Sequence, residues 1–455
     1  MIRHIALFSV VLLLLFLVYE HAGVFAATST VEAVPKTATE LLGQASAEKT
    51  AKLLMEQPTQ LQRYEVPSQA LQQWFALRDT RPALLFYAND PLLQSTTATM
   101  QKNLQARLAD QDQGVLFTDF TDPLILPKMT VRSALQAGLF SAVYWVMPEK
   151  GEISELSIDT FRKQMVQSGA VNDDAAKAFT LRDGVFSGMV GGVPFHALHP
   201  QADFSITGPV AFHFDLGYLA PLYKGEIKTP IYPLIYQALK HLRAQKVQTI
   251  AVSLSYSQLS GEVPLGSRFI GEAFDQLLRQ PKMLDERMPD IWRERAKALY
   301  LPEMLMVNDA RNTLLQLVDS HHDDPSLHFA LYQVSREVRE ARHAALGHLA
   351  NAVQLDPIYA LEYLLLAPVA REKGHPDEAL RMLRLAHEGY ADNPFITLEL
   401  ARALLFANHD DDAIVLLQEL LALNWSTTIY PDMPEFLQQL ITEAGSQKST
   451  ENSKQ

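Results

Sequence analysis

The chain has 455 residues, of which 48% are hydrophobic and 20% are charged, and its formal net charge is −13. This ordinary globular composition leaves room for two or three domains, and the negative charge argues against a nucleic-acid backbone as the main partner. Cysteine is absent, which excludes disulfides, thiol catalysis, zinc–thiolate sites and a cysteine-linked lipid anchor.

Residues 1–26 have the pattern of a secretory signal peptide. Arg3 precedes an apolar run, Ile5–Val18, and small residues surround Ala26 and Ala27. The run is shorter than the roughly 20 residues that span a bilayer, and an acidic residue follows it. We therefore expect cleavage beside Ala26 and export to the periplasm or to the medium. An uncleaved N-terminal anchor is the alternative, and it is the only membrane contact that the sequence predicts.

Residues 27–81 are expected to form a helical lead-in to the first domain. Apolar residues recur at roughly helical spacing from Thr39 to Met55, and Pro67-Ser68 has the composition of a second helix start. The helical period ends near Arg81, where a different pattern begins.

Residues 82–280 predict an α/β domain. Short apolar runs end in polar turns and alternate with helix-like segments, one of which is expected to begin with Thr229 as its cap. Val185–Val190 and Val193–Ala197, joined by two glycines, predict a β-hairpin. This alternation is typical of three layers around a largely parallel sheet. The expected strands are Ala83–Tyr87, Val115–Phe117, Ala142–Met147, Val210–Phe214 and Thr249–Leu254.

Polar residues follow several of these strands. In open α/β sheets the functional crevice lies beyond the carboxyl ends of the strands, so a candidate site is expected there. Its members would come from Asn89, Asp90, Asp119, Asp122, Asp215 and Ser255.

One of these strand ends bears a short motif. His213 and Asp215 point to the same side of a strand, and the run from His213 to Pro221 resembles the arginase-type motif, in which aspartates two residues apart bind paired manganese ions. Gly217 and Ala220 stand where that family has carboxylates. A single carboxylate does not make a site for a hard divalent ion. His213 and Asp215 are therefore weak metal candidates, and no metal or other cofactor is predicted.

A charged loop precedes the helix that is expected from Thr229. It contains Lys224, Glu226 and Lys228. Cations beside a helix N-terminus can bind an anion, and a solvated charged loop is the alternative.

Three alanines in the last third of the chain, Ala345, Ala379 and Ala413, are spaced 34 residues apart (379 − 345 = 34; 413 − 379 = 34). Each is followed four residues later by a leucine and seven residues later by an alanine or a leucine. Turn residues such as Gly374-His375-Pro376 separate the helix-like segments. Because small residues mark close helix crossings, each period predicts a helix, a tight turn and a second helix.

This pattern resembles the tetratricopeptide repeat, a helical hairpin of about 34 residues, and the resemblance covers residues 323–445. Pro357 stands where that family often has proline, whereas Gln333 occupies a position for a small residue. Pro368 is expected to kink or shorten its helix. The resemblance implies a solenoid that binds other proteins, and a generic helical bundle is the alternative.

Flanking segments complete the expected organisation. A helical connector, 281–322, precedes the repeats and shields their first hairpin, and Glu435–Ala444 is expected to cap the other end. The polar tail, 446–455, is expected to be disordered. The predicted architecture is a three-layer α/β domain followed by an α-helical, tetratricopeptide-like solenoid.

In the family that the repeats resemble, the first helix of each hairpin lines a concave groove. That register implies an apolar binding face for a protein or peptide partner in the cell envelope, unless the face docks on the α/β domain. We expect a non-catalytic binding or scaffolding role, with an arginase-like hydrolase that uses its repeats as a recruiting arm as the alternative. The implied face consists of Leu327, Val334, Leu361, Leu364, Arg371, Leu398, Arg402 and Leu405.

Overall fold

The structure is a computed structural model that describes residues 51–109, 120–259, 261 and 263–452. Its described residues form two compact units, and the boundary between them along the chain falls between Thr313 and Leu314. A short segment, Phe120–Pro123, groups with the second unit although it lies early in the sequence. The expected signal peptide and the expected strand Val115–Phe117 lie outside the described residues.

The first unit is built on a sheet with nine described strands in the order β1-β9-β8-β3-β4-β7-β6-β5, with β2 also paired to β9. The central neighbours β9, β8, β3, β4 and β7 run parallel, while β5 and β6 continue the sheet as antiparallel strands. The strands are β1 Lys52–Leu53, β2 Gln62–Tyr64, β3 Ala83–Tyr87, β4 Val143–Val146, β5 Thr180–Arg182, β6 Val185–Val190, β7 Val193–Leu198, β8 Val210–Asp215 and β9 Gln248–Ser255.

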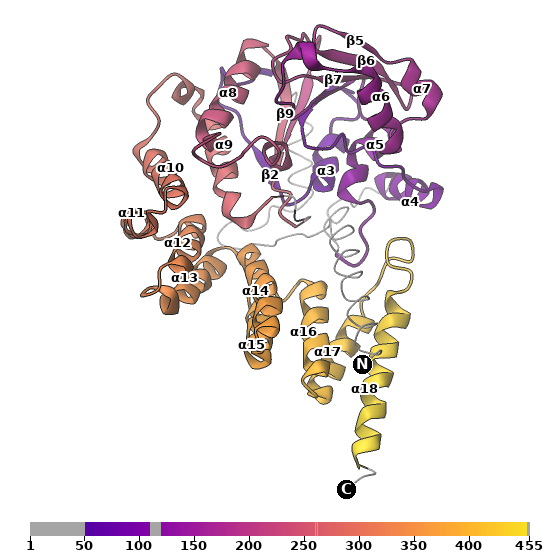
Figure 1. The fold of residues 1–455 in the computed structure, drawn as a ribbon. Helices are drawn as coiled ribbons and strands as arrows, with labels where there is room; N and C mark the ends of the chain where they lie inside the picture. The colour runs from indigo at the N-terminus through magenta and orange to yellow at the C-terminus, as the bar shows by residue number, and fades with distance from the viewer. Residues whose placement is uncertain (1–50, 110–119, 260, 262, 453–455) are drawn as a thin grey trace. The chain divides into compact units, whose positions relative to one another are not determined.

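Helices cover both faces of this sheet, which confirms the α/β fold class (Figure 1). Tyr87 and Phe214 face α8 and α9, where the ring of Phe214 lies 4.3 Å from that of Phe274. His213 lies on the other face, with its ring 5.5 Å from that of Trp74 in α3. The helices are α3 Ala70–Phe75, α4 Ala98–Ala109, α5 Thr130–Gln136, α6 Ile158–Gln167, α7 Asp173–Lys177, α8 Ile231–Ala244 and α9 Phe269–Arg279.

Two local expectations for this unit are wrong. The described part of the lead-in starts with strands, because β1 and β2 both pair with β9 and so bury Leu54 and Met55 in the sheet core. Long-range strand pairing here overrides a weak helical pattern. Thr229 is not a helix cap: its hydroxyl accepts a bond from Lys224 N, and α8 begins two residues later. The helix expected at Pro67 is present as a 3₁₀ turn that continues into α3.

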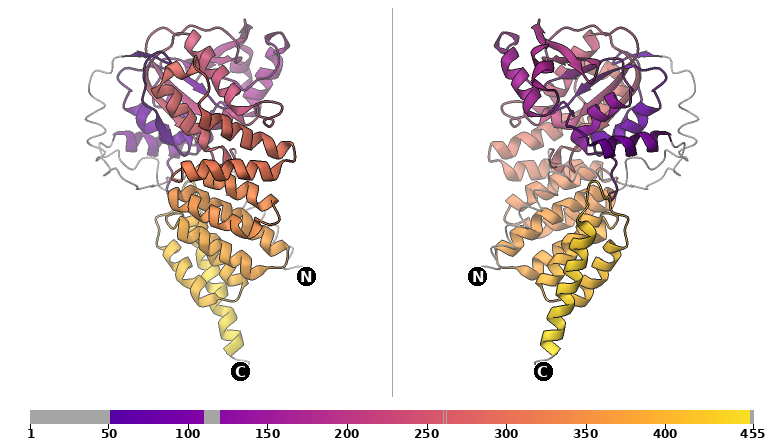
Figure 2. Two further views of the ribbon diagram at one scale, coloured as in Figure 1. Left: turned by 90° about the vertical axis from the view of Figure 1, so that its left-hand side faces the viewer. Right: turned by 90° about the vertical axis from the view of Figure 1, so that its right-hand side faces the viewer.

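The second unit is a series of antiparallel helix pairs, α12 with α13, α14 with α15 and α16 with α17, and Figure 2 shows these pairs stacked one after another. The second helices begin at Arg342, Pro376 and Asp410, so the structural period equals the sequence period (376 − 342 = 34; 410 − 376 = 34). This confirms the tetratricopeptide-like solenoid. The helices are α12 Pro325–Glu337, α13 Arg342–Leu355, α14 Leu361–Glu372, α15 Pro376–Gly389, α16 Pro394–Phe406, α17 Asp410–Leu421 and α18 Met433–Asn452.

Each hairpin starts with an acidic or amide side chain followed by proline. Asp324 accepts bonds from the backbone of Ser326 and Leu327, and Asn393 accepts one from Phe395 N at 3.0 Å. Asp356 plays the same part before the short 3₁₀ turn that leads into α14. Such caps satisfy the free N–H groups of the first helical turn, and proline fits there because it has no N–H to satisfy.

Pro368 lies inside α14, which continues to Glu372, and the kink or shortening expected there stays a prediction. Two details of the repeats differ from expectation. Gln333 is exposed, and Ser335 is the small residue that α12 buries instead. The C-terminal helix α18 continues through Asn452, so most of the tail that was expected to be disordered is helical. The connector is helical as expected, with α10 at Asp290–Glu303 and α11 at Val307–Ser320.

Candidate functional site

The strand order creates one switch point in the sheet. The chain runs from β3 outward through β4 to β7 and then returns to β8 on the other side of β3. Loops therefore leave β3 and β8 in opposite directions, and open α/β proteins bind ligands at such points. Asp90 follows β3 and Asp215 ends β8, so the structure brings these two predicted residues to the switch point.

Asp215 is buried and all its acceptor atoms are engaged. Its carboxylate accepts bonds from the hydroxyls of Ser255 and Ser257, and from Gly217 N at 2.7 Å. Burial raises the pKa of Asp215 to about 6, against the opposing effect of these three donors, and the nearby Asp90 adds to the rise. The group therefore titrates close to neutral pH.

His213 connects this carboxylate to a longer chain of polar groups. Its Nδ1 lies 2.9 Å from the Ser253 hydroxyl and its Nε2 lies 3.1 Å from the Ser255 hydroxyl. Because Ser255 donates its own proton to Asp215, it must accept from His213, which assigns the hydrogen to Nε2. Burial lowers the pKa of His213 to about 3, so the ring is neutral at physiological pH.

This arrangement uses the two weak metal candidates as hydrogen-bonding groups. Both ring nitrogens of His213 lie within hydrogen-bond distance of serine hydroxyls. The carboxylate of Asp215 accepts bonds from serine hydroxyls and also caps the 3₁₀ turn at Leu216–Leu219. Both side chains are therefore already bonded within the fold. Among the described residues there is no cluster of three or more His, Asp or Glu side chains that could hold a metal ion. Gly217 contributes its N–H where the arginase-type motif has a second carboxylate.

Two of the residues with a left-handed backbone lie beside the same site. Leu92, two residues after Asp90, has a φ of 55°, and Ser257 has a φ of 51°. Residues other than glycine rarely adopt this left-handed region, and such strain persists only where the surroundings enforce it. At Ser257 the bond to Asp215 is one contact that holds the strained residue in place.

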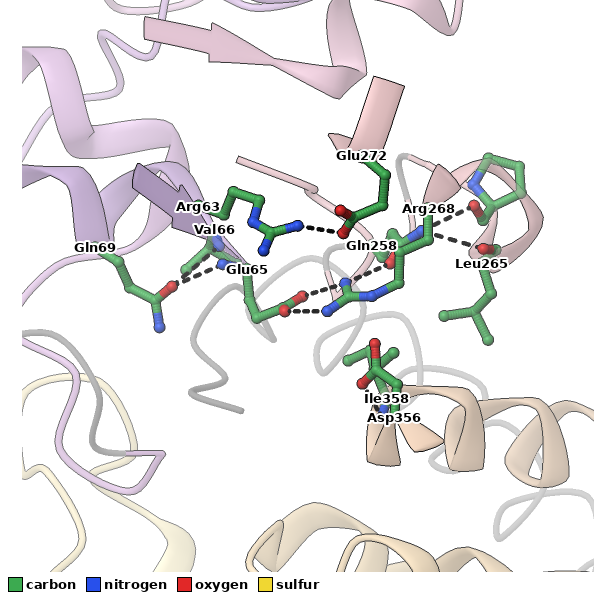
Figure 3. Close-up of polar contacts among 11 residues, drawn as sticks. Arg63, Glu65, Val66, Gln69, Gln258, Leu265, Arg268, Glu272, Asp356 and Ile358 are labelled. Carbon is green, nitrogen blue, oxygen red and sulfur yellow. Dashed lines mark hydrogen bonds and ion pairs between the residues drawn. The ribbon is translucent and has the colours of Figure 1, made fainter. Parts of the chain in front are cut away.

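A second polar group lies at the carboxyl end of β2, beside Ser257. The guanidinium of Arg268 donates to both carboxylate oxygens of Glu65, at 2.7 and 2.9 Å, and to Gln258 Oε1 at 3.1 Å (Figure 3). The backbone of Glu65 accepts a bond from Ser257 N, and Arg268 also covers the ring of Tyr256. This buried ion pair therefore fixes the loop that presents Ser257.

Sequence reasoning missed most of these partners. The run Ser253, Ser255 and Ser257 has the two-residue period of a strand face, and that period was the available signal. Glu65 and Arg268 lie 203 residues apart, so no local pattern connects them. Of the other predicted strand-end residues, Asn89 is exposed, Asp119 is outside the described residues, and Asp122 belongs to the segment that groups with the second unit.

The charged loop before α8 does not present a free helix N-terminus. Glu226 is buried and accepts the bond from Ile231 N, the first residue of α8. Its own carboxylate therefore occupies the position that an anion would take. Lys224 and Lys228 remain exposed on the loop.

In the second unit, the expected binding face is partly exposed. Leu327 and Leu398 are buried, so they contribute to packing. The others retain exposure, and Arg371 is the most open of them: these are Val334, Leu361, Leu364, Arg371, Arg402 and Leu405. Their role in binding stays a prediction.

The second unit also holds a short piece of the same chain, Phe120–Pro123, which we call the Phe120 segment. The carbonyl of Thr121 accepts a bond from Ser426 N at 2.8 Å, and its hydroxyl donates to Asn424 O at 2.9 Å. The ring of Phe120 lies edge-on to Tyr390, at 6.2 Å. The unit therefore binds a segment distant in the sequence through one backbone carbonyl, one hydroxyl and one aromatic ring.

The receiving loop, between α17 and α18, is rigidly held. Trp425, which lies between the two residues that bond to Thr121, packs against the rings of Phe395 and Tyr430. Its indole N–H donates to Leu420 O at 2.8 Å. Anchored in this way, the loop offers a carbonyl and an N–H at fixed positions.

Residues 370–424 match the family model of the tetratricopeptide repeat. The C-terminal unit thus contains a tetratricopeptide repeat. The match begins near the end of α14 and ends after α17, and so includes the best-kept small-residue positions, Ala379 and Ala413. No match was found among curated proteins. Tetratricopeptide repeats generally mediate protein–protein interactions, which supports an interaction or scaffolding role for this unit.

Proposed function

We propose that this protein is an exported envelope protein whose tetratricopeptide unit binds a short peptide segment of a partner protein. The observation that carries the proposal is the Phe120 segment, in which Thr121 pairs its backbone with Ser426. A main-chain N–H donor beside an aromatic contact can bind peptides of varied sequence, because a bond to the backbone carbonyl does not depend on the bound side chain. The partly exposed leucines of the first helices, Leu361 and Leu364, would extend the contact.

The binding proposal can be tested with a peptide that has the sequence of residues 117–126. In the intact chain the tethered Phe120 segment competes at high effective concentration. The variant with Phe120→Ala and Thr121→Val removes that competition, and we expect it to bind the labelled peptide at least about tenfold more tightly than the unaltered chain does. Fluorescence anisotropy gives both affinities.

A matched control makes the same two types of substitution elsewhere in the unit. Phe406→Ala with Thr442→Val alters two exposed residues of the same unit outside the receiving loop and should leave peptide binding as weak as in the unaltered chain. Leu364→Asp in the freed variant then tests whether the first-helix face contributes. If the freed variant does not bind the peptide, the proposed peptide site is wrong.

Export is supported by the basic start and the apolar run that precede Ala26. N-terminal sequencing of the protein recovered from the cell envelope should begin at Ala27 or Thr28. A protein that still begins at Met1 in the membrane fraction would establish the N-terminal anchor instead.

The hydrolase alternative gains no support from the switch point. Asp215 and His213 are both used by neighbouring serines, and Asp215 remains the only position that matches a metal ligand of the arginase-type motif. Binding is therefore the function that the described residues favour.

A further inference from the structure

Two equivalent loops of the repeats hold the Phe120 segment. Tyr390 follows α15 and Asn424 follows α17, and these two residues lie one repeat period apart (424 − 390 = 34). The ring of Phe120 contacts the first loop at Tyr390. Thr121 bonds to the second loop at Asn424 and Ser426. Each loop therefore contacts a different residue of the bound segment.

The first loop meets the bound ring with a ring of its own. Phe120 lies edge-on to Tyr390, with the centroids 6.2 Å apart and the planes at 74°. Phe120 is 8% exposed and Tyr390 is 5% exposed, so both rings are nearly withdrawn from water. An edge-on aromatic pair is favourable beyond the area that it buries, because the positive edge of one ring meets the negative face of the other. An aliphatic side chain in place of Phe120 would keep the burial and lose this contribution.

The second loop offers Thr121 both an acceptor and a donor. The Asn424 carbonyl accepts a bond from the Thr121 hydroxyl at 2.9 Å, and Ser426 N donates to the Thr121 carbonyl at 2.8 Å. Any residue can make the bond to Ser426, since every residue has a backbone carbonyl. The bond to Asn424 needs a short side-chain donor, and serine and threonine place an O–H directly on Cβ. Thr121 is 7% exposed, so water is poorly placed to replace a lost hydroxyl.

Backbone bonds fix the positions of the two loops. Tyr390 N donates to Ala386 O at the end of α15, and Tyr430 N donates to Ser426 O at 2.8 Å in the second loop. The aromatic contact and the hydroxyl acceptor therefore have a set spacing before any segment binds. That spacing suits two neighbouring residues in one order, the aromatic residue first and the hydroxyl residue second.

We propose that the peptide site of the tetratricopeptide unit selects partner segments in which an aromatic residue is followed directly by serine or threonine. This inference rests on the proposed function, because it concerns the same site, and it adds the side chains that the partner must present. The bond from Ser426 N would hold a segment of any sequence, whereas the contacts with Tyr390 and Asn424 O distinguish one sequence from another.

The test measures labelled peptides of residues 119–126 by fluorescence anisotropy. Residues 117 and 118 repeat the phenylalanine and threonine of the segment, so the peptide starts at Asp119 and contains the pair once. For the same reason the chain carries Phe117→Ala and Thr118→Val in addition to the two substitutions of the freed variant. All affinities are measured on this one chain, so its own segment affects every peptide equally.

Substitutions in the peptide then test each side chain separately. Phe120→Ala should weaken binding at least about tenfold, and Phe120→Leu should weaken it about threefold or more because the edge-on contact is lost. Thr121→Val should weaken binding by about three- to tenfold, while Thr121→Ser, which keeps the hydroxyl, should stay within about twofold.

Two control peptides separate this selectivity from general apolar binding. Ile125→Ala removes an apolar side chain beyond the Phe120 segment, where the chain groups with the first unit, and should change the affinity by less than about twofold. Phe120→Thr with Thr121→Phe keeps the composition, reverses the order and should weaken binding at least about tenfold. Equal affinities for the unaltered, reversed and Thr121→Val peptides would overturn the selectivity and leave the peptide site standing. If no peptide binds, the site and its selectivity are both wrong.

Discussion

The two units satisfy their buried polar groups over very different distances along the chain. In the tetratricopeptide unit, Asp324 caps its helix by bonding to residues two and three positions away. In the α/β unit, His213 bonds to a serine 40 residues away, and Glu65 pairs with an arginine 203 residues away. Where polar groups are satisfied locally, the free energy of unfolding is close to a sum of contributions from neighbouring helices. Where they are satisfied by long-range pairs, it depends on the whole sheet.

The largest expected effect comes from breaking the buried ion pair of the α/β unit. Arg268→Ala leaves the Glu65 carboxylate buried without its main partner, so unfolding should become easier by about 3–5 kcal/mol. Urea unfolding measures this. Arg381→Ala removes an exposed pair with Glu378 on α15 and should change the free energy of unfolding by less than about 1 kcal/mol. Equal effects of the two substitutions would contradict the contrast between the units.

A core substitution in the repeats should have a large but local effect. Leu417 is fully buried, and Leu417→Ala should destabilise its surroundings by about 3 kcal/mol. Because repeats interact with their neighbours, amide hydrogen exchange should accelerate in α16, α17 and α18 and stay unchanged in β3 and β8. Val415→Ala, at an exposed position of the same helix, is the control. Faster exchange throughout the sheet would show that the two units unfold together.

The hydrogen-bond network at the switch point should make the free energy of unfolding depend on pH. The contribution of His213 is masked by an opposite contribution of Asp215. The folded pKa of His213 is lowered to about 3, so its contribution is present above about pH 6.5 and is lost on acidification. The folded pKa of Asp215 is raised to about 6, so its contribution grows as the pH falls from about 6 to about 4. The two slopes oppose each other in this window.

Asp215→Asn removes the pH dependence that Asp215 contributes and leaves the pH dependence that His213 contributes. The variant should therefore lose about 1.4 kcal/mol more stability per pH unit than the unaltered chain between about pH 6 and about pH 4. Urea titrations across that range measure the difference. Asp285→Asn, at an exposed pair with Arg243, should not reproduce it, and parallel curves for Asp215→Asn and the unaltered chain would show that the pKa of Asp215 is not raised in the folded state.

The smallest expected effect is the loss of one local cap. Asn393→Ala removes the acceptor for Phe395 N and should cost about 1 kcal/mol, while Asn393→Asp should preserve stability because aspartate caps equally well. Thermal unfolding of the tetratricopeptide unit, followed by its Trp425 fluorescence, reports both. A cost for the aspartate variant as large as that for alanine would mean that burial of Asn393, rather than capping, is what matters there.

The sequence by itself determined the architecture of the repeats. A 34-residue period, buried alanines such as Ala379 and Ala413, and Asp-Pro or Asn-Pro helix starts are all local signals, and helices are local structures whose bonds lie within a few residues. Local signals also predicted β3, β4, β8, β9 and the hairpin of β6 and β7, because alternation and apolar runs are also local. They did not predict β1, β2 and β5, which are too short to be recognised without the strand that they pair with.

Tertiary structure alone decided which polar residues meet. Asp90 and Asp215 come together only because the strand order reverses between β3 and β8, and Ser257 reaches Asp215 from a loop held by Glu65 and Arg268. The physical reason is that these contacts are between segments far apart in the chain, whose meeting depends on the completed sheet and not on any pattern of neighbouring residues.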